Sequence, residues 1–274
     1  MLFHDIEKLK LLVKAAANEE ILKDFGHSKC EYKLDGSVVT PADLAMESRM
    51  EKELKQHWPQ YGILGEEMLE DKQQSIINQA ELNKDWGYWC VDPLDGSTNY
   101  AAGLPFFAVS VALIINNQQQ LAVVYDPVRD EMFTAIKGHG AYLNERRVGQ
   151  VNSLSKIKFP ENKPIVAEID LKRLPGELAM KLVNESIFAS QRNIGSSVLD
   201  WCWLAAGRFD IYLHGGQKLW DYAAGSLIFH EAGGHSISLD NEAVFRGQLE
   251  LRSVLACIDK SLFDYWYQWI GIGD

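Results

Sequence analysis

The stretch from residue 88 to residue 100 constrains this 274-residue chain more than any other. Its apolar first part, Tyr88 to Val91, predicts a strand, and two aspartates follow it, Asp92 and Asp95. Pro93 fixes its own φ and lacks an N–H group, and Gly96 permits backbone angles closed to other residues. We therefore expect a turn at this point, with two carboxylates on it.

Ser97, Thr98 and Asn99 follow the turn, and all three residue types favour helix starts. Free N–H groups at a helix start, together with the positive end of the helix dipole, form a site for an anion. Carboxylates bind hard cations such as Mg²⁺, and Mg²⁺ commonly pairs with phosphate. The stretch therefore predicts a metal-assisted phosphate site.

Two other interpretations exist for this stretch taken alone. Asp-Pro and Asp-Gly pairs are common in ordinary loops, so a purely structural turn is one alternative. An aspartyl-phosphate phosphatase of the haloacid dehalogenase type is disfavoured. That chemistry needs an Asp-x-Asp spacing after a strand, whereas the spacing here is Asp-x-x-Asp.

The charge balance agrees with a metal site. The chain has 27 Lys and Arg against 38 Asp and Glu, a formal net charge of −11. Because it contains no run of basic residues, we expect no nucleic-acid-binding surface. An acidic protein acting on an anionic phosphate needs cations at its site, and bound metal ions would supply them.

Cysteine usage and hydropathy predict a cytoplasmic protein. The four cysteines are scattered without a Cys-x-x-Cys pair, which is typical of reduced, mostly buried thiols. The first ten residues contain charges and no apolar signal core. No apolar run reaches membrane-spanning length, so we expect no membrane association.

Hydrophobic periodicity divides the chain into two halves. The first half, 1–150, is expected to contain helices over 2–21 and 41–57, a short strand at 63–65, a loop or loose helix over 71–84, and an antiparallel meander of strands over 106–115, 121–125 and 132–136. The composition shifts to Ser, Asn, Lys and Pro over 151–163, where we place the boundary. The second half, 151–274, alternates strands and helices, which indicates an α/β arrangement.

Further carboxylates stand where strands end or helices begin. Asp43 lies at the third position of a helix that Thr40 would cap, so it could cap the helix and also face the site. Glu66 and Glu67 follow the short strand. Asp221 lies where a loop becomes a helix, and its simplest role is that of an N-cap. Sheets in α/β proteins place ligands at such strand ends.

On these residues the sequence resembles the Mg²⁺-dependent, Li⁺-sensitive inositol monophosphatase family. The matching segments, in family order, are 65–67, 92–99, 220–225 and 231–234, with looser matches at 39–43 and 138–144. The resemblance implies a layered α-β-α-β-α sandwich, with an antiparallel sheet in the first half and an α/β second half. It also implies a homodimer and a small phosphate ester as substrate.

The resemblance implies a role for each matching residue. Glu66, Asp92 and the carbonyl of Leu94 would hold one Mg²⁺; Asp92, Asp95 and Asp221 would hold a second, and Glu66 would touch a third, with Mn²⁺ as a possible replacement. The phosphate would lie against Gly96, Ser97 and Thr98. The Ser97 hydroxyl, with Asp43 or Glu67, would orient the attacking water. Lys33 could guard the phosphate or could simply be solvated.

Two residues depart from the family pattern. Ser97 replaces the usual threonine and keeps the hydroxyl. His214 replaces the glutamate with which the animal enzymes grip inositol hydroxyls, and a histidine cannot accept two hydroxyl hydrogen bonds as a carboxylate can.

The sequence leaves several functions open. We expect hydrolysis of a small polyol or sugar phosphate, with inositol 1-phosphate first. The alternatives are a 3′(2′),5′-bisphosphate nucleotidase, which often has a lysine where Lys218 stands, or an enzyme acting on fructose 1,6-bisphosphate or histidinol phosphate. A catalytically silent relative with a binding role is a further alternative.

Overall fold

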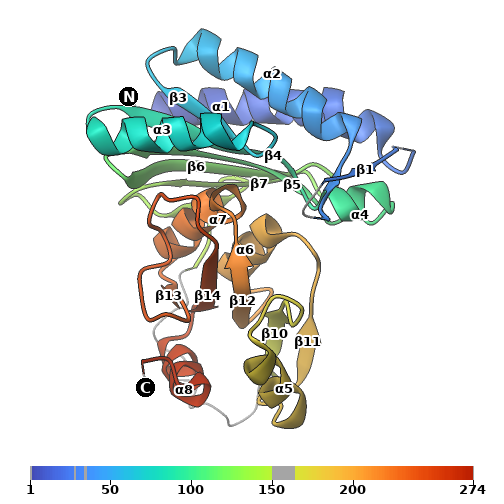
Figure 1. The fold of residues 1–274 in the computed structure, drawn as a ribbon, viewed down its shortest axis with the longest axis vertical. Coiled ribbons are helices and arrows are strands. Elements are labelled where there is room, and N and C mark those ends of the chain that lie inside the picture. The colour runs from blue at the N-terminus through green and yellow to red at the C-terminus, as the bar shows by residue number, and fades with distance from the viewer. Residues whose placement is uncertain (1, 28, 34–35, 150–163, 274) are drawn as a thin grey trace.

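The computed structural model describes residues 2–27, 29–33, 36–149 and 164–273. Its helices and strands form five layers (Figure 1). From one end to the other these are α1 (Leu2–Ala16) with α2 (Pro41–His57), a seven-stranded sheet, α6 (Ser197–Ala205) with α7 (Leu219–Glu231), a five-stranded sheet, and α5 (Gly176–Asn184) with α8 (Lys260–Ile270). The predicted α-β-α-β-α sandwich is confirmed.

The seven-stranded sheet contains the predicted meander. Its strands lie in chain order: β3 (Gly62–Gly65), β4 (Gly87–Asp95), β5 (Ala108–Ile115), β6 (Gln118–Asp126), β7 (Glu131–Ile136), β8 (Ala141–Leu143) and β9 (Arg146–Arg147). From β4 onward every neighbouring pair is antiparallel. The first pair, β3 and β4, is parallel, and α3 (Glu70–Leu82) provides the crossover that such a pair needs.

The five-stranded sheet belongs to the second half of the chain. Its order is β11 (Ser190–Arg192), β10 (Val166–Ile169), β12 (Ile211–Gln217), β14 (Arg252–Cys257) and β13 (His235–Ile237). The first three strands are parallel, so their carboxyl ends meet at one edge of the sheet. The pairings of β14 with β12 and β13 are antiparallel.

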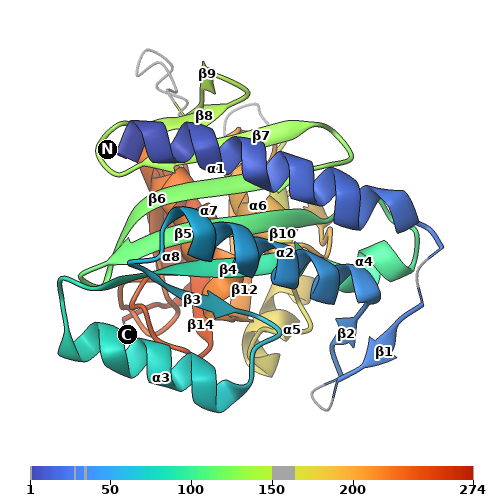
Figure 2. The ribbon, with the colours of Figure 1, turned by 90° about the horizontal axis from the view of Figure 1, so that it is seen from above.

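The N-terminal segment runs along the outer face of the large sheet (Figure 2). After α1 the chain makes a π-helical turn at Ala17–Ile21 and a 3₁₀ turn at Leu22–Asp24, followed by a hairpin of β1 (Glu31–Tyr32) and β2 (Val38–Val39). The predicted start of α2 is confirmed. The Thr40 hydroxyl accepts a hydrogen bond from the Ala42 N–H at 3.2 Å, and Asp43 Oδ2 accepts one from the Thr40 N–H at 2.7 Å.

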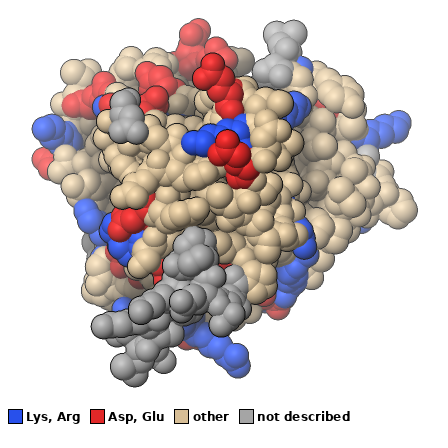
Figure 3. Space-filling view, turned by 90° about the horizontal axis from the view of Figure 1, so that it is seen from below, with Lys and Arg blue, Asp and Glu red and all other residues tan. Residues whose placement is uncertain are grey.

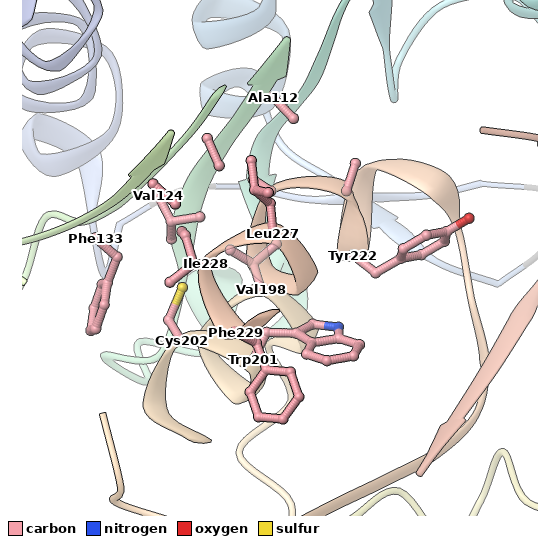
Figure 4. Close-up of a cluster of buried hydrophobic side chains, with 14 of the residues drawn as sticks. Ala112, Val124, Phe133, Val198, Trp201, Cys202, Tyr222, Leu227, Ile228 and Phe229 are labelled. Atoms are coloured by element: carbon pink, nitrogen blue, oxygen red, sulfur yellow. The ribbon is translucent and has the colours of Figure 1, made fainter. Parts of the chain in front are cut away.

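The largest core lies between the two sheets, around α6 and α7 (Figure 4). Trp201 from α6 packs against Phe229 from α7, with ring centroids 5.4 Å apart. Because α7 has a sheet on either side, ten of its thirteen residues are buried. The core therefore joins side chains from both halves of the chain.

Several expectations about individual elements are corrected by the structure. The polar stretch after Glu67 forms the regular helix α3, in which Gln73 and Ile77 are buried. Strand β4 does not stop at Val91 but continues to Asp95. The short strand β13 was not expected, because each of its three residues is only half-buried. The boundary expected at 151–163 lies outside the described residues, so the division into two halves stays a prediction.

Charged side chains are spread over the one face of the molecule that Figure 3 shows. Seen from below, uncharged side chains cover most of the face, with acidic and basic side chains dispersed among them (Figure 3). No basic patch gathers among the coloured side chains of this face. Within the described ranges, no helix has both the length and the apolar character needed to cross a bilayer.

Candidate metal centre and active site

Three aspartates predicted as metal ligands lie together. One carboxylate oxygen from each of Asp92, Asp95 and Asp221 lies within 4.8 Å of the others. In a regular strand, residues three apart point to opposite faces. The pairing of β4 with β5 shifts register between Asp92 and Asp95, and this irregularity lets both carboxylates reach the same side. The positions of Asp92 and Asp95 after an apolar run can be read from the sequence. The bulge that brings their carboxylates together cannot.

Neighbouring groups hold these carboxylates in place. Asp95 Oδ2 accepts hydrogen bonds from the Ser196 hydroxyl and from the Val198 N–H at 2.9 Å. Asp92 Oδ1 accepts one from the Leu94 N–H at 3.1 Å. In each aspartate these bonds engage only one carboxylate oxygen. The other oxygen keeps its lone pairs for another ligand.

Asp221 is placed differently from the prediction. Helix α7 begins at Leu219, its N-cap is Lys218, and Asp221 occupies the third helical position. There Asp221 Oδ2 accepts a hydrogen bond from the Lys218 N–H at 2.8 Å. The carboxylate therefore caps the helix from inside the first turn and is not the N-cap residue itself.

The electrostatics of the three aspartates favour a bound cation. Burial raises the pKa of Asp92 and of Asp221 well above the usual range, and the charges of neighbouring carboxylates raise both further. Burial also raises the pKa of Asp95 to about 6, although its hydrogen bonds to Ser196 and Val198 act in the opposite direction. A metal ion would remove the repulsion, and carboxylate oxygens are the donors that hard cations prefer. The donor set fits a divalent cation.

Gly96 and Ser97 make the turn next to this group. Gly96 has φ of 91°, and a Cβ there would lie 2.7 Å from the Phe106 carbonyl oxygen, so only glycine fits. Ser97 begins the short helix α4 (Ser97–Ala101), as predicted, and Thr98 is exposed on it. The Leu94 carbonyl, expected to bind metal, lies 2.8 Å from the Ser97 hydroxyl.

Ser97 is bonded to one of the two residues expected to share its role. Its hydroxyl donates to Asp43 Oδ1 at 2.5 Å. Asp43 is fully buried, and its Oδ2 accepts a hydrogen bond from the Thr40 hydroxyl at 2.6 Å. Burial raises the pKa of Asp43, while the bonds from Ser97 and Thr40 oppose that shift. Asp43 thus fixes the direction of the Ser97 hydroxyl.

Glu66 and Glu67 form a second acidic group around Lys33. Lys33 Nζ lies 3.0 Å from Glu66 Oε1 and 2.5 Å from Glu67 Oε1. Burial raises the pKa of Glu66 to about 7, with the charge of Lys33 opposing the shift. For Lys33, burial acts to lower the pKa, but the two glutamates outweigh it and the pKa is raised. Lys33 therefore faces the acidic site and is not a merely solvated lysine.

His214 is buried in β12, with contacts different from those expected of a substrate ligand. Its Nδ1 accepts a hydrogen bond from the Gly216 N–H at 3.1 Å, and its Nε2 lies 3.5 Å from Asp170 Oδ2. Burial lowers the pKa of His214 to about 4. The ring is therefore neutral at pH 7, with protein groups next to both nitrogens.

The structure adds supporting residues that sequence reasoning missed. Glu47 Oε2 accepts a hydrogen bond from the Glu67 N–H at 2.8 Å, and Gln73 Nε2 donates to the Gly65 carbonyl at 2.8 Å. Both fix the segment that carries Glu66. Ser196, which bonds Asp95, had a sequence signal as a helix start. Glu47 and Gln73 are ordinary polar helix residues whose roles depend on tertiary contacts.

The chain is similar in sequence and in structure to known proteins of one family. The model of the inositol monophosphatase family matches residues 4–264. The Nus factor SuhB of Haemophilus influenzae is 38% identical over 205 residues, 72% of this chain and 70% of that protein. Inositol monophosphatase 1 of Solanum lycopersicum is 38% identical over 236 residues, 83% of each chain. The crystal structure of the extragenic suppressor protein suhB from Bartonella henselae has a TM-score of 0.76 and 29% identity, covering 96% of this chain and 98% of that one.

The fold and the site are those of a five-layer α/β sandwich protein with a carboxylate centre that could hold metal ions. The family model matches almost the whole chain, residues 4–264. The chain belongs to the inositol monophosphatase family.

Proposed function

We propose that the protein is a Mg²⁺-dependent phosphomonoesterase acting on a small polyol or sugar phosphate, with inositol 1-phosphate as the first substrate to test. The observation that carries the proposal is the group of Asp92, Asp95 and Asp221 close to the bonded pair of Ser97 and Asp43. Family membership supports the same reaction class. The three aspartates would supply acidic ligands for cations, and Ser97 with Asp43 would supply a polar pair for a water molecule.

Two sets of oxygens would hold the metal ions. Glu66, Asp92 and the Leu94 carbonyl form one set, and Asp92, Asp95 and Asp221 form the other; Glu66 would also reach a third, weaker ion. Bound Mg²⁺, or Mn²⁺ in its place, would lower the pKa of a bound water and stabilise charge on the phosphate oxygens.

The chain's own groups would orient the reactants. Because the Ser97 hydroxyl donates its proton to Asp43, its oxygen has lone pairs free to accept a hydrogen bond from the attacking water. Backbone N–H groups of Gly96 and Ser97, next to Thr98, would hold the phosphate. Lys33 would add positive charge to that side of the site, and Glu67 would act through Lys33.

A panel of phosphate esters tests the proposal. Inositol 1-phosphate, fructose 1,6-bisphosphate, histidinol phosphate and phosphoadenosine phosphate are each assayed for released phosphate, with Mg²⁺ and with excess chelator. We expect release only with Mg²⁺ or Mn²⁺, with inhibition by Ca²⁺ and Li⁺. Full activity in excess chelator would contradict the metal mechanism.

A binding role without catalysis is the second candidate. It is favoured by the name Nus factor SuhB, which a relative at 38% identity carries. The same panel separates the two functions. Release of phosphate from none of the esters, by a protein that is folded and binds Mg²⁺, would favour the binding role.

We also propose that the protein is a cytoplasmic homodimer. Three of its four cysteines are buried and all four are free, which agrees with a reducing compartment. Light scattering at micromolar concentration tests the assembly, and a monomer would reject it.

A further inference from the structure

The loop after β10 lies against the end of β12. Ile169 pairs with Leu213 across these parallel strands, and the Asp170 N–H donates to the Leu213 carbonyl at 3.2 Å. A Cβ on Gly215 would lie 1.8 Å from the Arg173 carbonyl oxygen, so this close approach requires glycine. The loop that carries Asp170 and Arg173 is therefore held in place beside His214.

This loop stands at the edge of the sheet that faces the metal centre. Parallel strands β11, β10 and β12 end together there. The chain after β11 leads to Ser196, which bonds Asp95, and the chain after β12 leads to Asp221.

The His214 ring has no acceptor left for a substrate hydroxyl. Since Nδ1 accepts from the Gly216 N–H, the proton of the neutral ring lies on Nε2, the nitrogen 3.5 Å from Asp170. The residue is only 4% exposed. The ring can therefore steady the Asp170 carboxylate through its Nε2–H, but it cannot accept a hydrogen bond from a substrate hydroxyl.

Asp170 has the capacity that His214 lacks. Its Oδ1 accepts a hydrogen bond from the Lys172 N–H at 3.1 Å, and its Oδ2 lies 3.7 Å from Arg173 Nε. The side chain is 21% exposed. A carboxylate has about four lone-pair positions, so several remain for a ligand.

We propose that Asp170 is a specificity-determining residue that accepts hydroxyl groups of the substrate's alcohol part, and that His214 positions it. The substrate class is then a phosphate monoester of a polyol with free hydroxyls near the ester. The inference rests on the proposed phosphatase function and deepens it. Asp170 supplies a carboxylate next to the position where His214 cannot provide one.

Kinetics on two esters test the inference. Inositol 1-phosphate presents several hydroxyls, and 4-nitrophenyl phosphate presents none. For Asp170→Asn we expect kcat/KM to fall about 30-fold on inositol 1-phosphate, since a site built to bond a hydroxyl discriminates strongly, and to change less than about twofold on 4-nitrophenyl phosphate. Asp240→Asn, the same change at an exposed turn carboxylate, should affect neither ester.

The positioning role of His214 is tested by variants that keep or remove an N–H donor next to Asp170. His214→Asn keeps an N–H donor and His214→Leu does not, so His214→Leu should raise the KM for inositol 1-phosphate more, with kcat little changed. Equal losses on both esters, or no loss on inositol 1-phosphate for Asp170→Asn, would overturn the inference. So would a wild-type protein that does not prefer the polyol ester. Failure of the phosphatase proposal is a separate outcome, because wild-type protein would then release phosphate from neither ester.

Discussion

The acidic site contains two groups of carboxylates that differ in how their charge is balanced. Glu66 and Glu67 have the ammonium group of Lys33 within 3.0 Å. Among the described residues, no basic side chain forms an ion pair with Asp92, Asp95 or Asp221, and their pKa values are all raised. The difference teaches that the aspartates have room for a cation from outside the chain, whereas the glutamates are already partly neutralised by Lys33. Changes to the aspartates should therefore abolish function, whereas removal of Lys33 from the second group should only adjust it.

The largest effect is expected for Asp95→Asn. The change removes one negative charge from the aspartate group while keeping the side chain's shape. Metal affinity and stabilisation of the transition state both suffer, so kcat should fall on the order of 10³-fold on every ester. Steady-state kinetics with saturating Mg²⁺ measure this.

A Mg²⁺ titration by calorimetry provides the control for Asp95→Asn. It should show weaker binding than in the wild type. Near-normal kcat in the variant would mean that Asp95 is not a metal ligand.

The second effect is expected for Ser97→Ala. Losing the hydroxyl that Asp43 fixes should lower kcat about 10²-fold and leave Mg²⁺ binding unchanged. Ser97→Thr is the matched control, because it keeps the hydroxyl and should keep most of the activity. Equal losses in the two variants would show that packing, and not the hydroxyl, matters here.

A smaller effect, in the direction of tighter metal binding, is expected for Lys33→Ala. The lysine competes with a metal ion for Glu66, so its removal should lower the Mg²⁺ concentration for half-maximal activity by about threefold. A Mg²⁺ titration of the activity at fixed substrate checks this. An unchanged midpoint would mean that Lys33 leaves Glu66 when the metal binds.

The elements of the fold could largely be predicted from the sequence. The apolar runs of β5 and β6 have strong local signals. The cap of α2 does too, because Thr40, Pro41 and Asp43 are neighbours in the chain. Helix α3 was uncertain because it buries only two side chains, so its apolar stripe is weak.

The site was predictable only in part, for a physical reason. The carboxylate types and their positions at strand ends follow from local residues. The partners do not: Lys33 meets Glu66 across 33 positions, and Asp170 meets His214 across two strands. The sequence gives no local signal for such tertiary contacts, so the true surroundings of His214 could not be inferred.

The smallest effect on activity is expected for Glu168→Gln, which isolates burial from metal binding. Burial raises the pKa of Glu168 to about 7, with a bond from the Ile194 N–H opposing it. The folded protein therefore binds this proton more tightly than the unfolded chain. Proton binding by Glu168 therefore stabilises the folded protein fully below about pH 4.5, and this stabilisation is lost as the pH rises through 7.

Thermal unfolding with saturating Mg²⁺ measures this pH dependence. We expect the glutamine variant to be more stable than the wild type by at most about 3 kcal/mol at pH 8 and by little at pH 4. Activity on all esters should be unchanged. An equal difference at both pH values would show that Glu168 does not titrate in this range.

The bonds that steady Asp95 have a consequence for the order of folding. Asp95 and Ser196 are 101 positions apart, and Asn99 Nδ2, close by, donates to the Ile194 carbonyl at 2.8 Å. Contacts between such distant segments form late, because a long loop must close first. Each sheet can assemble from nearer neighbours before these bonds exist. During refolding we therefore expect helical signal to return before the capacity to bind Mg²⁺, which appears only when the two sheets have docked.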